Sequence, residues 1–306
     1  MNLDTRPSLS LGNQRSLLLD RARIMGIINV TPDSFSDGGQ FFAVEQAVAH
    51  GLRLAAEGAD ILDVGGESTR PGATPIATST ELARIIPVIE ALARVCPLPI
   101  SVDTSKPEVM IAAVAAGAVL INDVRALREP GALAAAADTD AAICLMHMQG
   151  APAHMQLAPH YGQVVEDVKK FLTERMMACR IAGIAQQRLL IDPGFGFGKT
   201  IEHNLALLAG LGQLCALNVP VLVGLSRKRM LAELTGRELD QRVFASIAAA
   251  VLAVERGAQI VRVHDVAATR DALLLAHAVK EMQPKVQSVP RKTDAISQAR
   301  ALFGED

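Results

Sequence analysis

Eight short apolar runs are spaced along this 306-residue chain, and nearly all of them end at a polar residue that can take part in chemistry. The alanine-rich, amphipathic stretches between them have helical length, so the pattern predicts a strand followed by a helix, eight times over. Such an alternation favours a parallel sheet, and eight units favour a closed (β/α)8 TIM barrel of the α/β class. The runs are residues 24–30, 59–65, 99–103, 118–123, 141–147, 189–192, 219–226 and 259–265.

Length and composition fit a single domain of this kind. A (β/α)8 barrel takes about 250 residues, and 50% of this chain is hydrophobic, which is enough for a large core. We expect the barrel to occupy residues 24–282, after an N-terminal extension 1–23 and before a loose C-terminal tail 283–306. Three glycines that follow helical stretches and precede apolar runs are expected to adopt the left-handed conformation of a helix C-cap: Gly58, Gly117 and Gly257.

The charge pattern restricts the partners of the chain. A formal net charge of -2 gives no general attraction to nucleic acid or to anionic lipid, so we expect neither. No apolar run approaches the ~18 residues that a membrane span needs, and residues 1–23 lack the long apolar region of a secretion signal. The four cysteines form no C-x-x-C pair, which is typical of buried, reduced thiols. Together these features predict a cytoplasmic protein.

The polar residues at the ends of the runs predict one active site, because such a barrel builds its site at the carboxyl ends of its strands. Asp103, Asn122 and Asp192 offer acceptors and a donor that suit a planar heterocycle with an amidine-like edge. A cationic set suits a phosphate or diphosphate: Arg70, Lys228, Arg262 and His264. The alternative is a buried ion pair within the barrel, such as Asp192 with Lys228.

Three loops that follow predicted strands are long and rich in glycine or polar residues: 29–39, 65–72 and 192–199. This composition is typical of mobile lids, although ordinary turn chemistry also accounts for it. The third loop ends in Gly-Lys-Thr, but Pro193 stands where a phosphate-binding loop requires glycine, so close backbone approach is the better interpretation of its glycines. The seven histidines form neither H-x-H nor H-E-x-x-H, which argues against a histidine-bound zinc ion. For His147 and His264, at predicted strand ends, a structural and a functional role are equally open.

Eight sequence blocks, in order between residues 24 and 282, resemble the dihydropteroate synthase family of folate biosynthesis. They are MGIINVTPDSFSDGG (25–39), DVGGESTRPG (63–72), SVDTS (101–105), IND (121–123), MHMQG (146–150), DPGFGFGK (192–199), SRK (226–228) and RVHD (262–265). Two departures are the Ala-Pro-Ala sequence at 151–153 and Arg229, at a position where some relatives have serine.

The resemblance implies a transferase that moves an alkyl group other than methyl. Its reaction joins the 7,8-dihydropterin-6-ylmethyl group, released from its diphosphate, to the amine of 4-aminobenzoate, with Mg2+ as cofactor. Such an enzyme yields 7,8-dihydropteroate and diphosphate, is a target of sulfonamides, and is expected to be a homodimer. Mg2+ and cations neutralise the leaving diphosphate while the electron-rich pterin carries the charge of its methylene, which favours an SN1-like path.

The resemblance also assigns roles to individual residues. The pterin would be held by Asp103, Asn122, Asp192 and Lys228, with Arg262 stacked over the ring. The diphosphate would meet Thr69, Arg70, Arg262 and His264, and Asn29 would bind the Mg2+. The 4-aminobenzoate pocket would comprise Phe35, Asp37, Thr69, Arg70, Pro71, Phe195 and Ser226, with the start of the helix after Lys228 also receiving the carboxylate. The residues expected to be catalytic are Asp103, Lys228 and Arg262.

Two alternatives use a similar ring pocket. A barrel that passes a methyl group from methyltetrahydrofolate to a corrinoid would lack the 226–228 set and the first loop, both of which this chain has. A catalytically silent pterin-binding relative would be expected to have lost Asn29, Arg70 or Lys228, all of which are present.

Overall fold

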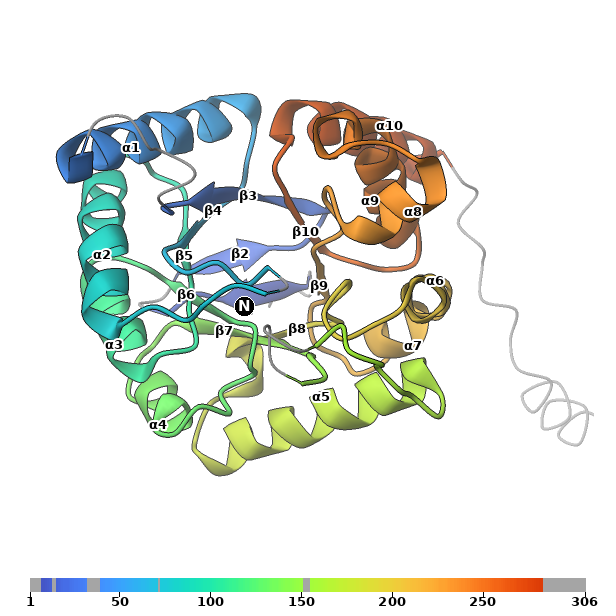
Figure 1. Cartoon of the computed structure of the whole chain (residues 1–306), viewed down its shortest axis with the longest axis horizontal. Helices are drawn as coiled ribbons and strands as arrows, with labels where there is room; N and C mark the ends of the chain where they lie inside the picture. Colours follow the sequence, from blue (N-terminus) through green and yellow to red (C-terminus); the bar gives the residue numbers. More distant parts are fainter. Residues whose placement is uncertain (1–6, 13–14, 32–38, 71, 151–154, 283–306) are drawn as a thin grey trace, which may run out of the picture.

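The computed structural model describes residues 7–12, 15–31, 39–70, 72–150 and 155–282. A barrel of eight parallel strands lies inside a ring of helices (Figure 1). Neighbouring strands follow the order β8-β7-β6-β5-β4-β3-β10-β9. A parallel bridge between Ile191 in β8 and Val221, directly before β9, joins the first and last strands and closes the barrel. The predicted (β/α)8 TIM barrel is confirmed.

The strands coincide with the eight predicted runs, although most are shorter. They are β3 Arg23–Asn29, β4 Ile61–Gly65, β5 Ile100–Asp103, β6 Leu120–Asp123, β7 Ala142–Met146, β8 Leu189–Asp192, β9 Leu222–Val223 and β10 Ile260–Val263. The largest difference is at β9, where the predicted run 219–226 yields two strand residues. Pro220 has no N–H for a sheet ladder, and Arg227 turns the chain with a φ of 56°. These two features confine regular pairing to the middle of the run.

Helices cover the outside of the barrel. They are α1 Gly39–Glu57, α2 Thr78–Val95, α3 Pro107–Ala115, α4 Ala132–Ala137, α5 Val164–Ile181, α6 Ile201–Ala209, α7 Gly212–Cys215, α8 Arg229–Thr235, α9 Val243–Glu255 and α10 Val266–Glu281, with short 3-10 turns η2 Gln186–Arg188 and η3 Leu239–Gln241. In α2, Ile85, Val88, Ile89 and Leu92 recur at helical spacing and are fully buried. Burial of each such side chain contributes about 1.5–3 kcal/mol.

An antiparallel hairpin closes the amino end of the barrel. Its strands are β1 Ser8–Ser10 and β2 Ser16–Leu18. The leucines in and beside the hairpin are buried in one cluster with side chains of the barrel interior: Leu9, Leu11, Leu17 and Leu19 against Met25, Ile61, Leu120, Ala142, Cys144, Leu190, Leu222 and Ile260. Since this cluster fills the amino end, the barrel can open only at the other end, where the strands finish.

The turns from helix to strand are built as predicted. Gly58, Gly117 and Gly257 have φ angles of 102°, 119° and 104°, which is the left-handed region that favours glycine. None of the helices in the described ranges combines the length and the apolar character that a membrane span requires.

Candidate active site

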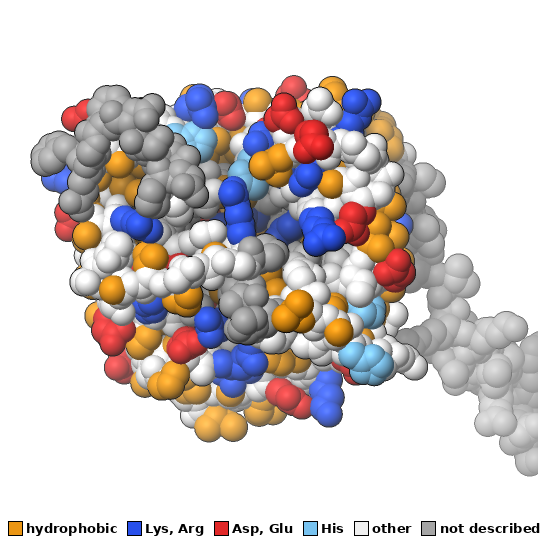
Figure 2. Space-filling model, in the orientation of Figure 1, with side chains coloured by type: hydrophobic (Ala, Val, Ile, Leu, Met, Phe, Trp, Pro, Cys, Tyr) orange, Lys and Arg blue, Asp and Glu red, His pale blue; other side chains and the backbone are white. Residues whose placement is uncertain are grey.

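A cavity of about 840 Å3 opens at the carboxyl ends of the strands. Residues at the ends of six strands line it: Asn29, Asp103, Asn122, Met146, Asp192 and Arg262. On this face of the molecule, Lys and Arg side chains gather near the centre (Figure 2). The position agrees with the rule that barrels of this type bind ligands at the carboxyl ends of their strands.

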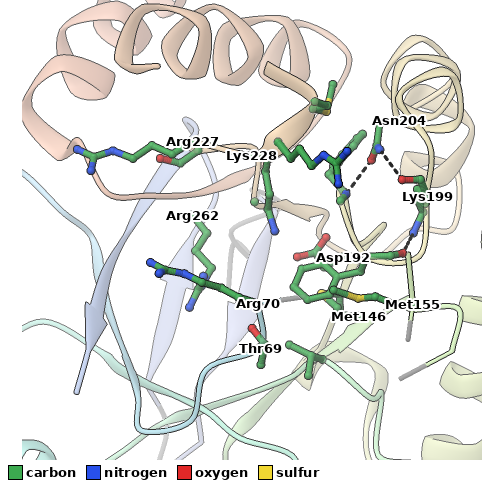
Figure 3. A pocket seen from close by; sticks show the side chains of 18 of the residues that line it. Thr69, Arg70, Met146, Met155, Asp192, Lys199, Asn204, Arg227, Lys228 and Arg262 are labelled. Atoms are coloured by element: carbon green, nitrogen blue, oxygen red, sulfur yellow. Dashed lines mark hydrogen bonds between the residues drawn. The ribbon is translucent and has the colours of Figure 1, made fainter. Parts of the chain in front are cut away.

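The structure brings most of the predicted site residues together around this cavity. Those that line it are Asn29, Thr69, Arg70, Asp103, Asn122, Asp192, Phe195, Ser226, Lys228, Arg262 and His264 (Figure 3). Three further residues that were predicted to belong to the site lie outside the described residues: Phe35, Asp37 and Pro71. The described part of the cavity therefore contains both the carboxylate and amide set and the cationic set.

Arg262 is the central cation of the cavity, and two carboxylates hold it. Its Nε donates to Asp63 Oδ2 at 2.6 Å, and a terminal nitrogen donates to Asp103 Oδ2 at 2.8 Å. Asp63 is completely buried and also accepts from Asn122 Nδ2 at 3.3 Å. Among the described residues, the ion pairs inside the barrel are those of Arg262, and none joins Asp192 to Lys228. A buried ion pair thus exists, but with other partners than the sequence suggested.

Burial brings the titrations of several cavity groups close to neutral pH. It raises the pKa of Asp103 to about 7, against the lowering effect of Arg262, and it raises the pKa of Asp192 to about 6. It lowers the pKa of Lys228 to about 8, although Asp192 raises it. A cluster of groups whose pKa values are displaced in this way is typical of a functional site.

The glycine-rich loop after β8 is a fixed wall of the cavity. Gly194, Gly196 and Gly198 all have left-handed φ angles, of 68°, 77° and 59°. An added Cβ at Gly194 would collide with the carbonyl oxygen of His147, and one at Gly198 with that of Gln149. The glycines therefore permit close backbone approach, as predicted. Residues 192–199 are buried or half-buried, so this loop is a packed wall of the cavity and not the mobile lid that its composition suggested.

The lysine of the Gly-Lys-Thr sequence faces into this loop. Lys199 is 3% exposed, and its Nζ donates to the carbonyl oxygens of Gly194 and Phe197 and to Nδ1 of His147. Burial, together with the charge of Lys199, lowers the pKa of His147 to about 2, so the imidazole is a neutral acceptor. Of the two roles left open for His147, the structure supports the structural one.

The turn after β9 aims two polar residues at the cavity. Arg227 has a left-handed φ of 56°, and its guanidinium makes two hydrogen bonds with Asp265, at 2.6 and 3.1 Å. Its backbone N–H donates to Ser246 Oγ at 2.9 Å, so the strained conformation is held from two sides. On either side of Arg227, Ser226 and Lys228 line the cavity.

Ser226 and His264 form a hydrogen-bonded pair. The hydroxyl of Ser226 accepts the backbone N–H of His264 at 3.2 Å and lies 2.9 Å from its Nδ1. Burial lowers the pKa of His264 to about 3, with a further contribution from Arg262, so the imidazole is neutral and His264 does not belong to the cationic set in which the sequence placed it. A hydroxyl donates one hydrogen bond and accepts up to two, so Ser226 can donate to Nδ1 while it accepts the backbone N–H; in that tautomer the ring proton is on Nε2.

Sequence reasoning gave no role to several residues of the site: Asp63, Met146, Phe197, Lys199 and Asn204. For Asp63 a signal existed, because an aspartate within an apolar strand run needs a buried partner. For Lys199 the Gly-Lys-Thr sequence pointed outward to a phosphate, whereas the structure turns the side chain inward. Phe197 contacts Lys228, whose Nζ lies 4.1 Å from the ring centroid, and only the folded loop creates this contact.

Comparison with known proteins agrees with this site. The profile of the family described as pterin binding enzyme matches residues 25–264. Dihydropteroate synthase of Escherichia coli (strain K12) is 51% identical over 263 residues, which cover 86% of this chain and 93% of that protein.

Solved structures agree as well. Xanthomonas albilineans dihydropteroate synthase with 4-aminobenzoic acid has a TM-score of 0.86 and 61% identity, covering 92% of this chain and 100% of that chain. The same protein in complex with 7,8-dihydropteroate has a TM-score of 0.83 and 58% identity, covering 91% of this chain and 100% of that chain. The resemblance of the sequence blocks is confirmed, and the chain belongs to the pterin-binding enzyme family, among its dihydropteroate synthases.

Proposed function

We propose that the cavity at the carboxyl ends of the strands is where this chain transfers the 7,8-dihydropterin-6-ylmethyl group from its diphosphate to the amine of 4-aminobenzoate. The products are 7,8-dihydropteroate and diphosphate, which is the activity of dihydropteroate synthase in folate biosynthesis. The observation that carries the assignment of the site is the meeting of Asp103, Asn122 and Asp192 with the cations Lys228 and Arg262 in one cavity.

The carboxylates and the amide form the pterin subsite in this proposal. Asp103 and Asn122 lie at the ends of the neighbouring strands β5 and β6, and Asp192 ends β8; all three line the same cavity, so they can meet the polar edge of one planar ring. Since Arg262 occupies Oδ2 of Asp103, we assign Oδ1 of that carboxylate to a pterin N–H. A carboxylate has two oxygens with about four acceptor positions, so Asp103 can accept from Arg262 and from the pterin at the same time. Lys228 completes this subsite.

Two arginines, a hydroxyl and a neutral imidazole form the diphosphate subsite. We assign Thr69, Arg70, Arg262 and His264 to the phosphate oxygens, with Arg70 the exposed member of this set. In the tautomer in which Ser226 donates to Nδ1, the His264 ring proton is on Nε2, where it can be donated to a phosphate oxygen. A guanidinium remains charged throughout and can stabilise the growing charge on the leaving group.

Mg2+ is the cofactor of the proposed reaction, with Asn29 as its protein ligand. The described residues include no group of three or more His, Cys, Asp or Glu that could hold a metal ion. A neutral amide oxygen fits a Mg2+ ion that takes its remaining ligands from diphosphate and water, as this metal does in many phosphate-transferring sites. When bound, Mg2+ would neutralise part of the charge on the departing diphosphate.

The 4-aminobenzoate subsite lies at the outer part of the cavity in this proposal. Phe195, Thr69 and Arg70 line the described part, while Phe35, Asp37 and Pro71 belong to the part outside the described residues. We assign the benzoate carboxylate to Ser226 and to the backbone N–H groups at the start of α8, beside the Ser226 turn.

The groups around the pterin suit a dissociative, SN1-like transfer. Departure of diphosphate leaves positive charge on the pterin methylene, and Asp103, which is 11% exposed and lines the cavity, stabilises that charge when ionised. The nucleophile is an aromatic amine that is neutral near pH 7, so it attacks the cation without a strong general base. Lys228 and Arg262 stabilise the negative charge that grows on the departing diphosphate.

We further propose that the chain works as a cytoplasmic homodimer. The helices α9 and α10 pack against each other and expose several large apolar side chains: Phe244, Leu252, Leu274, Leu275 and Val279. These helices are the part of the surface that we assign to the contact between two copies. The cysteines are free thiols, three of them buried, which agrees with a reducing compartment.

A coupled assay of diphosphate release tests the proposed function. The purified chain is supplied with 6-hydroxymethyl-7,8-dihydropterin diphosphate and Mg2+, with and without 4-aminobenzoate. Release that requires the amine and yields dihydropteroate is the expected result. Tight pterin binding without release would instead identify a catalytically silent relative.

A further inference from the structure

Lys199 carries a buried amino group whose hydrogen-bond partners are all neutral. Its Nζ lies 2.9 Å from His147 Nδ1, 2.9 Å from the carbonyl oxygen of Gly194 and 3.1 Å from that of Phe197. An ammonium group has three N–H donors, so these contacts use all of them. A buried charge without an ionic partner in contact is costly to a fold. The transfer reaction proposed above gives Lys199 no contact with a substrate.

Three links connect Lys199 to the pterin subsite. It holds the carbonyl oxygen of Gly194, and the N–H of the same glycine donates to Asp192 Oδ1 at 2.7 Å. It also holds the carbonyl oxygen of Phe197, whose ring lies under the Nζ of Lys228. Finally, the positive charge of Lys199 acts on the Asp192 carboxylate through the buried loop (Figure 3). The ammonium group of Lys199 therefore fixes the backbone of the loop at Gly194 and at Phe197.

We propose that Lys199 is a positioning residue for pterin recognition, which keeps the Asp192 carboxylate ionised and aimed at the ring by its charge and its hold on Gly194. The inference rests on the proposed function, because it takes Asp192 as a pterin acceptor. It differs from a purely structural role in one respect: part of the effect of Lys199 depends on charge, and so on pH.

The charged and titratable groups around the pair support this inference. Asp192 faces Lys228 from the turn after β9, Arg262 from β10 and Cys144 from β7. Arg262 is already engaged by Asp63 and Asp103, and burial keeps the Cys144 thiol protonated by raising its pKa well above its usual value. This leaves Lys199 and Lys228 as the cations that act mainly on Asp192.

The surroundings of Lys199 itself are His147, Tyr161 and the same Asp192 and Lys228. Burial lowers the pKa of Lys199 to about 7, while Asp192 raises it. Since His147 is neutral, Asp192 is the anion that favours the charged form of Lys199, and the two ionised groups stabilise each other.

The test compares pterin binding by the full chain and its variants across pH, with 6-hydroxymethylpterin as the probe and titration calorimetry as the readout. Lys199→Met removes charge and donors, and Lys199→Gln removes the charge but keeps an N–H donor. Tyr161→Phe is the matched control, because it deletes the 2.6 Å hydrogen bond from the Tyr161 hydroxyl to the carbonyl oxygen of Gly198 and changes no charge. Circular dichroism checks the fold of each variant.

We expect both Lys199 variants to bind the probe about twofold more weakly than the wild type near pH 7 and about fivefold more weakly near pH 6, as a rise of about one unit in the pKa of Asp192 from about 6 predicts. The deficit should shrink as the pH rises, because the Asp192 carboxyl ionises again. Tyr161→Phe should show no such pH-dependent recovery. Wild-type affinity in both Lys199 variants, an equal deficit at every pH, or failure of both to fold would overturn the proposal. A wild-type chain that does not bind the probe would refute the proposed function instead.

Discussion

Replacing Asp63 with asparagine perturbs the group that anchors the central cation of the cavity. Asp63 is 0% exposed, and its Oδ2 accepts from Arg262 at 2.6 Å and from Asn122 at 3.3 Å. The amide keeps the shape of the side chain but removes one of the two carboxylates that neutralise Arg262. A hydrogen bond to a charged group contributes about 1.5–3 kcal/mol, and loss of one partner of a buried ion pair costs about 3–5 kcal/mol. Asp103 stays 2.8 Å from Arg262 and keeps part of the neutralisation. We therefore expect Asp63→Asn to lower the free energy of unfolding by about 3 kcal/mol, the value that the two ranges share.

Urea unfolding measures this loss of stability, and calorimetric titration with 6-hydroxymethylpterin measures its effect on the site. The pterin affinity should fall at least about tenfold, or ~1.4 kcal/mol, because Arg262 and Asn122 lose their shared anchor. Asp60→Asn is a matched control at the amino end of the barrel, where Asp60 pairs with Arg21 and Arg23. It should lower stability and leave pterin affinity unchanged. Wild-type stability and wild-type pterin affinity in Asp63→Asn would refute the reasoning.

Four further predictions address the reaction, its pH dependence, the hairpin and the assembly. Asp103→Asn should lower kcat more than pterin affinity, because the carboxylate stabilises the cation of the transition state; steady-state kinetics with a pterin titration would contradict this if only binding suffered. Pterin affinity should decrease as the pH falls from about 7 to about 6, the raised pKa values of Asp103 and Asp192, since protonation removes acceptors; titration calorimetry across that range checks it. Leu9→Ala, at a fully buried position of the hairpin, should cost about 2–5 kcal/mol of unfolding free energy in urea with little change in KM. Phe244→Glu should convert a dimer to a monomer in sedimentation velocity, and unchanged sedimentation would exclude this surface as the dimer contact.

Much of the fold was predictable because its signals are local. Each strand of a (β/α)8 barrel is buried on both faces, so it appears in the sequence as a short apolar run, and each helix shows its own period. The same regularity located the site, since Asp103, Asn122 and Asp192 follow directly from the strand ends. The N-terminal hairpin carried a weaker signal, because its strands have three residues each and acquire their buried environment only from the barrel.

The contacts inside the site were predictable only in part. Arg262 was expected beside the pterin, but its pairing with Asp63 joins residues 199 positions apart in the sequence, and no local pattern specifies such a pair. The pair suggested from the sequence, Asp192 with Lys228, had the correct charges and the wrong geometry. Likewise, the Gly-Lys-Thr sequence at 198–200 does not specify whether its lysine points to a phosphate or into the loop.

The order of strands and helices, the end of the barrel that carries the site, and the family were all predictable without coordinates, because they depend on residue types at fixed positions along the chain. The tertiary structure alone decided which charges meet, which are neutralised and which pKa values move. The physical reason is that electrostatic energies depend on distance and burial, and both are set by packing between segments that are remote in the sequence. Lys199 illustrates the difference: its position was evident from the sequence, while its role follows from the neutral atoms that surround it.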